Sequence, residues 1–262
     1  MTKLNTITTL GTNSAIPSIY RFTTSQYLNV NGVGFIVDCG EGAQIRLKQY
    51  GIKNNSISYV LISHLHGDHF FGLAGLISTM CMENRHKPLH IFGPERLEEV
   101  IEPQLEVSNT TRNFKCVYHV VDTETSNIIV HHDNVEVITI PLKHSVKTTG
   151  YLIKLTLPLK QCSYAYISDT IYKPDIVPLI QNVDVIYHEA TYLHDLKNQA
   201  DEKFHATAKE AGMIAQMANA KTLLIGHFSK RYPSIQPLVD EAKSIFPNTI
   251  AAEDGLCVPL FF

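Results

Sequence analysis

Three histidines and an aspartate directly follow a short apolar segment, and this juxtaposition constrains the fold more than any other feature of the sequence. Residues 59–62 are mostly aliphatic and β-branched, which predicts a buried strand. In an extended chain His64, His66 and Asp68 share one face. The glycine before Asp68 permits a bend that brings His69 to the same side. This pattern predicts a buried strand that ends in a polar cavity.

The imidazole and carboxylate groups of this cluster are ligands that divalent zinc prefers. A zinc ion with an open coordination position lowers the pKa of bound water from about 15.7 towards 7, which favours a hydrolase. Four ligands are too few for two metals, so a dinuclear site needs groups from the rest of the chain. The alternative is a solvated loop in which the histidines bind nothing.

The composition is that of a globular chain without a membrane segment. With 262 residues, 44% of them hydrophobic, and no stretch that resembles a linker, we expect one domain over residues 1–262. The net charge of −3 gives no general attraction to phosphate backbones, so we expect no DNA partner. The five cysteines lack CxxC spacing, and no signal peptide or run of about 20 apolar residues is present. These features predict a cytoplasmic protein with reduced thiols and no membrane contact.

Polar groups also follow three later apolar segments. Residues 163–167, 183–187 and 221–225 predict strands, and polar residues follow the first two directly and the third after Gly226. These polar residues include Asp169, His188, Glu189 and His227. Since polar groups recur at the C-terminal ends of short strands, we expect a metal cleft built on a sheet scaffold.

The remaining sequence predicts further strands and helices. Helices are expected over residues 43–50, 70–82, 95–101 and 207–217. Strands are expected over 4–10, 25–30, 34–37, 89–92, 114–121, 128–130, 135–140 and 150–157, with a hairpin turn at Asn31-Gly32. His131 and His132 lie between two of these strands and are expected in a solvated turn. Four histidines lack neighbours of ligand type and are expected on the surface or in the core; they are His86, His90, His119 and His194.

Asp38 has two interpretations. It ends the strand expected over 34–37 and precedes a turn that contains two glycines. Its carboxylate can accept a hydrogen bond that orients a metal-binding histidine. The alternative is a turn cap, which is the commoner role of an aspartate in such a position.

Seven motifs give the chain a family resemblance. They are VDCGEGAQ (37–44), SHLHGDHFFGLAGL (63–76), HSVKTTGY (144–151), SDT (168–170), HEAT (188–191), FHAT (204–207) and GHFSKRY (226–232). With these motifs in family order, the chain resembles the metallo-β-lactamase-fold hydrolases, and among them the ribonuclease Z (tRNase Z) branch, to which HEAT and FHAT point. The resemblance implies an α/β fold, an αββα four-layer sandwich of two mixed β-sheets flanked by helices.

The resemblance also implies a dinuclear metal site. One metal would be held by His64, His66 and His144, the second by Asp68, His69 and His227, and Asp169 would bridge both. Two Zn²⁺ ions about 3.5–4 Å apart can clamp the attacking and leaving oxygens of a phosphodiester. Mn²⁺ or Fe could take their place.

Four residues have catalytic roles in the resemblance. His205 would protonate the leaving 3′ oxygen, with Glu189 orienting its imidazole; such a general acid contributes about 10²–10⁴-fold. His188 would touch the scissile phosphate, and Asp68 would accept the proton of the attacking water. The alternatives are a helix cap for the HEAT segment and a surface position for His205.

Two departures from the family pattern leave the substrate open. The family motif PxKxRN is replaced by Pro17-Ser18-Ile19-Tyr20-Arg21-Phe22, and only 24 residues separate His144 from Asp169, too few for the usual tRNA-gripping arm. We therefore expect a zinc endoribonuclease acting in tRNA 3′-end processing on precursor tRNA, or a phosphodiesterase acting on small-molecule or short-RNA phosphodiesters. A noncatalytic metal or nucleic-acid-binding module is the third hypothesis. By resemblance the protein would be a homodimer.

Overall fold

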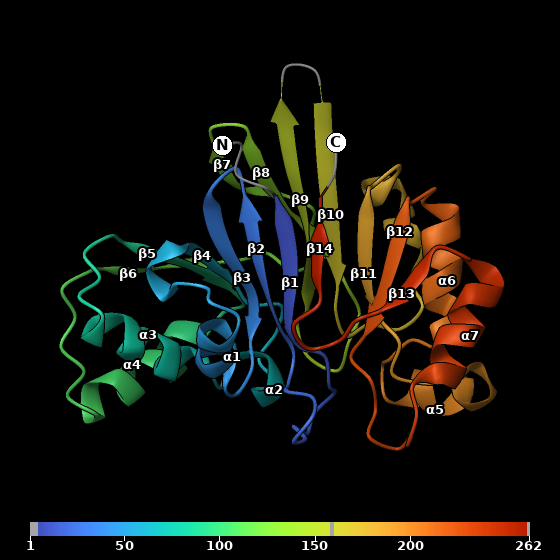
Figure 1. The fold of residues 1–262 in the computed structure, drawn as a ribbon, viewed down its shortest axis with the longest axis horizontal. Helices are drawn as coiled ribbons and strands as arrows, with labels where there is room; N and C mark the ends of the chain where they lie inside the picture. The colour runs from blue at the N-terminus through green and yellow to red at the C-terminus, as the bar shows by residue number, and fades with distance from the viewer. Residues whose placement is uncertain (1–4, 158–159, 261–262) are drawn as a thin grey trace. The chain divides into compact units, whose positions relative to one another are not determined.

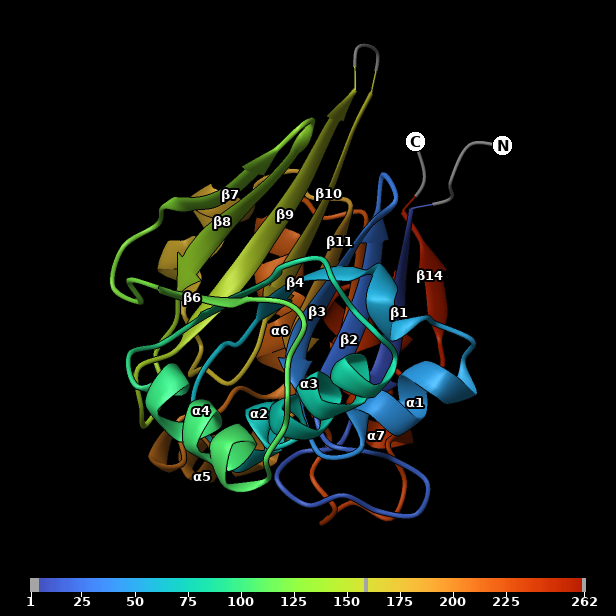
Figure 2. The ribbon, with the colours of Figure 1, turned by 90° about the vertical axis from the view of Figure 1, so that its left-hand side faces the viewer.

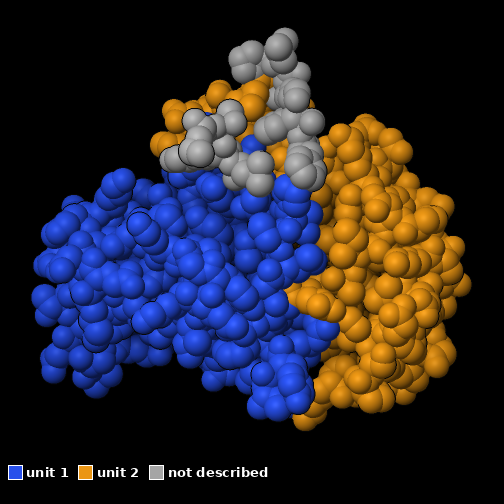
Figure 3. Space-filling model, in the orientation of Figure 1, with its two compact units in different colours: residues 1–121, 254–259 blue, residues 122–253, 260–262 orange. Residues whose placement is uncertain are grey.

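The computed structural model describes residues 5–157 and 160–260, which fall into two compact units. Unit 1 comprises residues 1–121 and 254–259, and unit 2 comprises residues 122–253 and 260–262 (Figure 3). Each unit holds one β-sheet with helices packed on it (Figure 1). The single domain expected over residues 1–262 stays a prediction.

The sheet of unit 1 contains seven strands within the described residues, in the order β14-β1-β2-β3-β4-β5-β6. The strands are β1 (Thr6–Gly11), β2 (Ser25–Val30), β3 (Val33–Cys39), β4 (Ile57–Leu61), β5 (Leu89–Gly93), β6 (Cys116–Val120) and β14 (Cys257–Pro259). β14, β1, β2 and β3 pair antiparallel, whereas β3 to β6 are parallel. Asn31 and Gly32 form the predicted hairpin turn, and both have the positive φ angle that a type I′ turn requires.

Helices cover one face of this sheet (Figure 2). They are α1 (Ala43–Gln49), α2 (Gly67–Phe70), α3 (Leu73–Met82) and α4 (Leu97–Val107). α3 buries Leu73, Leu76, Ile77 and Met80, which have the helical spacing of one apolar face. Burial of each such side chain contributes about 1.5–3 kcal/mol. This packing fixes the helices beside the short segment that carries the histidine cluster.

The sheet of unit 2 also contains seven strands within the described part of the chain, in the order β13-β12-β11-β10-β9-β8-β7. They are β7 (Ile128–His132), β8 (Val135–Pro141), β9 (Thr149–Leu157), β10 (Lys160–Ile167), β11 (Val185–Glu189), β12 (Thr222–Gly226) and β13 (Thr249–Ala251). β10, β11 and β12 are parallel neighbours. Their C-terminal ends therefore meet at one edge, as the sequence predicts, and this edge carries Asp169, Glu189 and His227.

Within its described residues, unit 2 has three α-helices, α5 (Lys197–Glu202), α6 (Ala208–Met217) and α7 (Gln236–Ile245), and two 3-10 helices, η2 (Pro174–Ile180) and η3 (His194–Leu196). α6 starts at a capping box, in which the Thr207 side chain accepts from the main chain of Glu210 and the Glu210 side chain accepts from the main chain of Thr207. Small residues on α6, among them Ala208 and Ala211, lie in the core of the unit. The cap fixes the chain two residues after His205.

Three predictions differ from the structure. The helix predicted over 95–101 is α4, which ends six residues later, at Val107. The helix predicted over 70–82 is two helices, α2 and α3, because the main-chain N–H of Gly72 donates to Cys39 O at 2.9 Å and interrupts the helical pattern. His131 and His132, predicted in a turn, form the end of β7 and are exposed there.

Candidate metal centre and catalytic residues

In unit 1, the histidine cluster follows β4, and hydrogen bonds to Asp38 hold it in place. The Asp38 carboxylate is fully buried and accepts three hydrogen bonds, from Ser63 N at 2.7 Å, Ser63 Oγ at 2.8 Å and His69 Nδ1 at 2.7 Å. Of its two interpretations, the acceptor that orients a histidine is therefore the one observed. Gly40 allows this turn to approach the cluster, since a Cβ there would lie 2.5 Å from Asp68 O.

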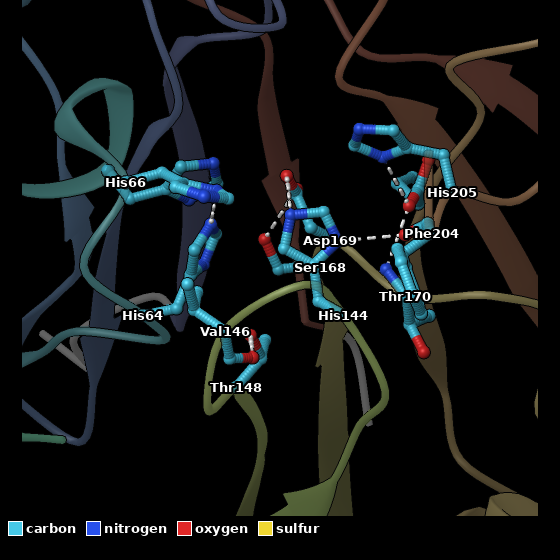
Figure 4. Close-up of polar contacts among 12 residues, drawn as sticks. His64, His66, His144, Val146, Thr148, Ser168, Asp169, Thr170, Phe204 and His205 are labelled. Atoms are coloured by element: carbon cyan, nitrogen blue, oxygen red, sulfur yellow. Dashed lines mark hydrogen bonds and ion pairs between the residues drawn. The ribbon is translucent and has the colours of Figure 1, made fainter. Parts of the chain in front are cut away.

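The ligand-type atoms of this cluster face one another. His64 Nε2 lies 3.0 Å from His66 Nδ1 (Figure 4), and His69 Nε2 lies 3.4 Å from Asp68 Oδ2. The other Asp68 contact comes from a loop: Ala15 N donates to Asp68 Oδ2 at 2.8 Å. Unit 1 thus brings together all four residues that the HxHxDH pattern singles out.

In unit 2, one carboxylate lies between two imidazoles. Asp169 follows β10, and its Oδ2 is 3.7 Å from His144 Nε2 whereas its Oδ1 is 3.2 Å from His227 Nε2. All three side chains are nearly fully buried. Each carboxylate oxygen thus faces a different histidine, which is the arrangement expected of a bridging ligand. Asp169, His205 and His227 also offer ligand atoms that lie within 4.8 Å of one another.

Three of the histidines, His64, His144 and His227, are held at Nδ1, which turns Nε2 toward the other groups of ligand type. His144 Nδ1 donates to Phe204 O at 2.8 Å, as Figure 4 shows. His227 Nδ1 is hydrogen-bonded to Thr191 Oγ1 at 2.9 Å, and His64 Nδ1 to Ser63 Oγ at 2.9 Å. Metal-binding histidines commonly have such an oxygen partner on the second ring nitrogen, because it fixes the tautomer and the ring orientation.

The protonation of His144 also suits a metal ligand. Burial lowers the pKa of His144, and the nearby Asp169 only partly opposes that effect. The ring is therefore neutral at pH 7, and neutral imidazole is the form that coordinates a metal. The donor set of histidines and aspartates, mostly buried and held by oxygen acceptors, thus fits a divalent metal.

Glu189 and His205 form a pair at the same edge of unit 2. Glu189 is fully buried, and its Oε1 accepts from His205 Nδ1 at 2.9 Å and from Thr170 N at 2.8 Å. Its Oε2 accepts from Thr191 Oγ1 at 2.6 Å. Burial raises the pKa of Glu189, but the ion pair and hydrogen bond with His205 outweigh it, so the net direction is downward. An ionised Glu189 can hold the His205 ring at Nδ1. The second ring nitrogen of His205, Nε2, is then directed away from Glu189.

His188 lies on the opposite face of the same strand. Side chains alternate along β11, so His188 shares the face of Ile186, which packs in the core with α6, and is fully buried. Its Nδ1 donates to Glu189 O at 2.7 Å. A buried ring in this position cannot make the contact with a scissile phosphate that the resemblance implies for His188.

Several partners of the site residues were not predicted from the sequence. Ser63 is hydrogen-bonded to His64, and Thr191 to His227. Both lie inside the motifs SHLHGDH and HEAT, and this position is the sequence feature from which their role could be predicted. The contact through Phe204 is made by a main-chain oxygen, which no residue type reveals.

Curated relatives match the chain over almost its whole length. Ribonuclease Z of Bacteroides fragilis is 36% identical over 296 residues, covering 96% of this chain and 97% of the relative. Ribonuclease Z of Phocaeicola vulgatus is 37% identical and covers 96% of each chain. This chain belongs to the ribonuclease Z family. The matched length exceeds the 262 residues of the chain, so these relatives carry segments that it lacks.

A family model described as anti-Pycsar protein Apyc1 also matches, over residues 5–244, so the chain belongs to that family as well. Among solved structures, human tRNase Z, short form (ELAC1), superposes with a TM-score of 0.85 at 28% identity and covers 98% of this chain and 100% of its own. The metallo-β-lactamase fold protein YhfI from Bacillus subtilis superposes with a TM-score of 0.80 at 20% identity over 98% of this chain and 100% of its own.

These matches confirm the predicted fold class. The ribonuclease Z family member has the metallo-β-lactamase fold, with two mixed sheets flanked by helices, and is a hydrolase with groups for a divalent metal. Within residues 5–157 and 160–260, no helix is long and apolar enough to cross a membrane.

Proposed function

We propose that this ribonuclease Z family member is a dinuclear zinc endoribonuclease that removes the 3′ trailer of precursor tRNA. The proposal is supported by relatives named ribonuclease Z at 36–37% identity and by the structural likeness to human tRNase Z. RNA rather than DNA is the proposed polymer. The two units would act together as one domain in a cytoplasmic homodimer.

The proposed metal ligands come from segments that lie far apart in the sequence. His64, His66 and His144 would hold one zinc, Asp68, His69 and His227 would hold the second, and Asp169 would bind both. The two oxygens of the Asp169 carboxylate, one near His144 and the other near His227, support this assignment. When bound, two divalent cations lower the pKa of water and stabilise the charge that develops on the phosphodiester oxygens. Mn²⁺ or Fe would serve the same geometry.

The chain's own residues handle the protons. Asp68 accepts the proton of the attacking water, since its carboxylate is partly accessible beside His69. His205 donates a proton from Nε2 to the leaving 3′ oxygen, because Glu189 occupies Nδ1. His188 acts through Glu189, whose main-chain oxygen it holds, rather than on the phosphate.

The buried Glu189–His205 pair is the observation that carries the catalytic proposal. A protein that only binds metal or RNA has no need for a leaving-group acid held by an ionised, fully buried carboxylate. The test is cleavage of bis(p-nitrophenyl) phosphate and of precursor tRNA by zinc-loaded protein, with chelated protein as the control. We expect both substrates to be cleaved and chelation to stop both reactions. If neither substrate is cleaved, the noncatalytic binding module replaces this proposal.

A second candidate function is hydrolysis of small or short-RNA phosphodiesters. It is favoured by the interval between His144 and Asp169, which β9 and β10 fill, leaving no room for an additional arm. A remote grip supplies binding energy for positioning a large substrate, and its loss affects large substrates most. Cleavage of small phosphodiesters without cleavage of precursor tRNA would select this second candidate.

A further inference from the structure

Arg231 is an exposed guanidinium that several neutral groups hold in one conformation. Its Cζ lies 4.1 Å from the centre of the Tyr192 ring, and its NH2 group donates to Tyr192 Oη at 3.1 Å. Its Nε donates to Ser229 Oγ at 3.1 Å, and its NH1 group lies 3.4 Å from Gln199 Oε1. A long side chain that is fixed in this way loses little further entropy when it binds a ligand.

The charge of Arg231 has no acidic partner among the residues that the structure describes. The groups that hold it are a hydroxyl, a phenol and an amide, none of which carries a charge. Two other basic residues of the same unit, Lys197 and Lys221, do pair with carboxylates. A preoriented, uncompensated guanidinium is suited to a phosphate, which accepts two parallel N–H bonds from its fork.

Tyr192 connects Arg231 to His205. The Tyr192 ring is almost fully buried, with its centre 6.1 Å from that of the His205 ring. The main chain fixes the same relation, because Ala208 N donates to Tyr192 O at 2.8 Å, three residues after His205. Arg231 therefore lies one ring away from the imidazole that faces the leaving group.

We propose that Arg231 binds the RNA phosphate on the 5′ side of the leaving nucleoside, one linkage from the scissile phosphate, and that Tyr192 positions it there. The inference rests on the proposed function, in which His205 protonates the 3′ oxygen of that nucleoside. It adds a phosphate contact that a substrate with a single phosphate cannot make. Arg231 thereby favours polynucleotides over small phosphodiesters.

The test combines Arg231 variants with RNA that has one neutral linkage. Three precursor-type RNAs are compared: an all-phosphate RNA, one with a methylphosphonate on the 5′ side of the leaving nucleoside, and one with a methylphosphonate on the 3′ side of the scissile bond. We expect Arg231→Ala to lower kcat/KM about 10- to 100-fold on the first and third RNAs. On the second RNA the loss should shrink to less than about threefold, because the partner charge is gone.

Two further variants separate binding from structure. Tyr192→Phe keeps the ring against His205 but removes the hydroxyl that accepts from Arg231, so it should reproduce part of the Arg231→Ala loss on the same RNAs. Lys243→Ala removes an equal charge from the exposed face of α7 and should change no RNA rate. The slope of log kcat/KM against log salt should fall by about 0.7 for Arg231→Ala alone.

An equal loss for Arg231→Ala on all three RNAs would overturn the inference and assign Arg231 a structural role. Rescue by the neutral linkage on the 3′ side instead would also overturn it. Absence of RNA cleavage by the wild type would overturn the proposed function together with the inference, whereas the first two outcomes leave the proposed function intact.

Discussion

At the residue scale, three residues of the candidate site have a strained backbone. Asp38, Phe204 and His227 have positive φ angles of 53°, 57° and 59°, a conformation that residues other than glycine seldom adopt. Each makes a contact with the site: Asp38 holds His69, Phe204 O holds His144, and His227 faces Asp169. Such strain costs about 1–3 kcal/mol per residue and persists where the surroundings fix it, often at functional sites.

Replacing His205 tests the proposed acid. His205→Ala should lower kcat for precursor tRNA by about 10²–10⁴-fold while the protein keeps its metal, because His205 donates a proton rather than holding the fold. Rates and metal content of the same preparation are the measurement. His66→Ala is the control, which should lose the metal of one site and nearly all turnover. A retained rate for His205→Ala would remove His205 from the mechanism.

Replacing Asp38 tests the orientation of His69. Asp38→Asn preserves the size of the side chain but offers His69 Nδ1 a weaker, neutral acceptor. We expect metal affinity to fall by about 10- to 100-fold, the usual effect of losing a partner of a metal-binding histidine. Titration with a competing chelator measures this affinity. Unchanged affinity in a folded variant would show that Asp38 serves only the turn.

At the element scale, the sequence predicts strands and their polar ends well but not the contacts that stop helices. The strands before His64, Asp169 and His227 are buried as their apolar runs predict, because burial on both faces requires such runs. The break between α2 and α3 depends on Gly72 meeting Cys39 across the fold, which periodicity along the chain cannot reveal. The HxHxDH cluster could be predicted because it directly follows an apolar run that forms a strand. Its hydrogen-bond partners could not, because they depend on tertiary packing.

A cross-element ion pair gives a pH-dependent prediction for unit 1. Glu102 of α4 accepts from both terminal nitrogens of Arg112 at 2.7 Å and from Tyr118 of β6 at 2.8 Å. Burial raises the pKa of Glu102, but these hydrogen bonds outweigh it, so its pKa is lowered. The stabilisation is therefore present above the unfolded-state pKa of about 4.3 and is lost as pH falls through the folded-state pKa.

Urea unfolding of wild type and Glu102→Gln at pH 7 and pH 3 measures this contribution. At pH 7 the variant should be less stable by about 1–2 kcal/mol, and at pH 3 the difference should shrink. If the difference in unfolding free energy between wild type and variant were equal at pH 7 and pH 3, the charge of Glu102 would not stabilise the contact between α4 and β6.

At the scale of the whole molecule, the seven proposed ligands are spread along the chain from His64 to His227, so no short stretch of sequence encodes a complete dinuclear site. The ribonuclease Z relative matches 96% of the chain. The order and spacing of the family motifs therefore predict all seven proposed ligands together. The central claim is that these ligands hold two metals. Metal content per chain, measured by mass spectrometry on zinc-loaded protein, tests it most directly. We predict two zinc ions for the wild type and at most one for His66→Ala and for His227→Ala; fewer than two in the wild type, or two retained in both variants, would contradict the account.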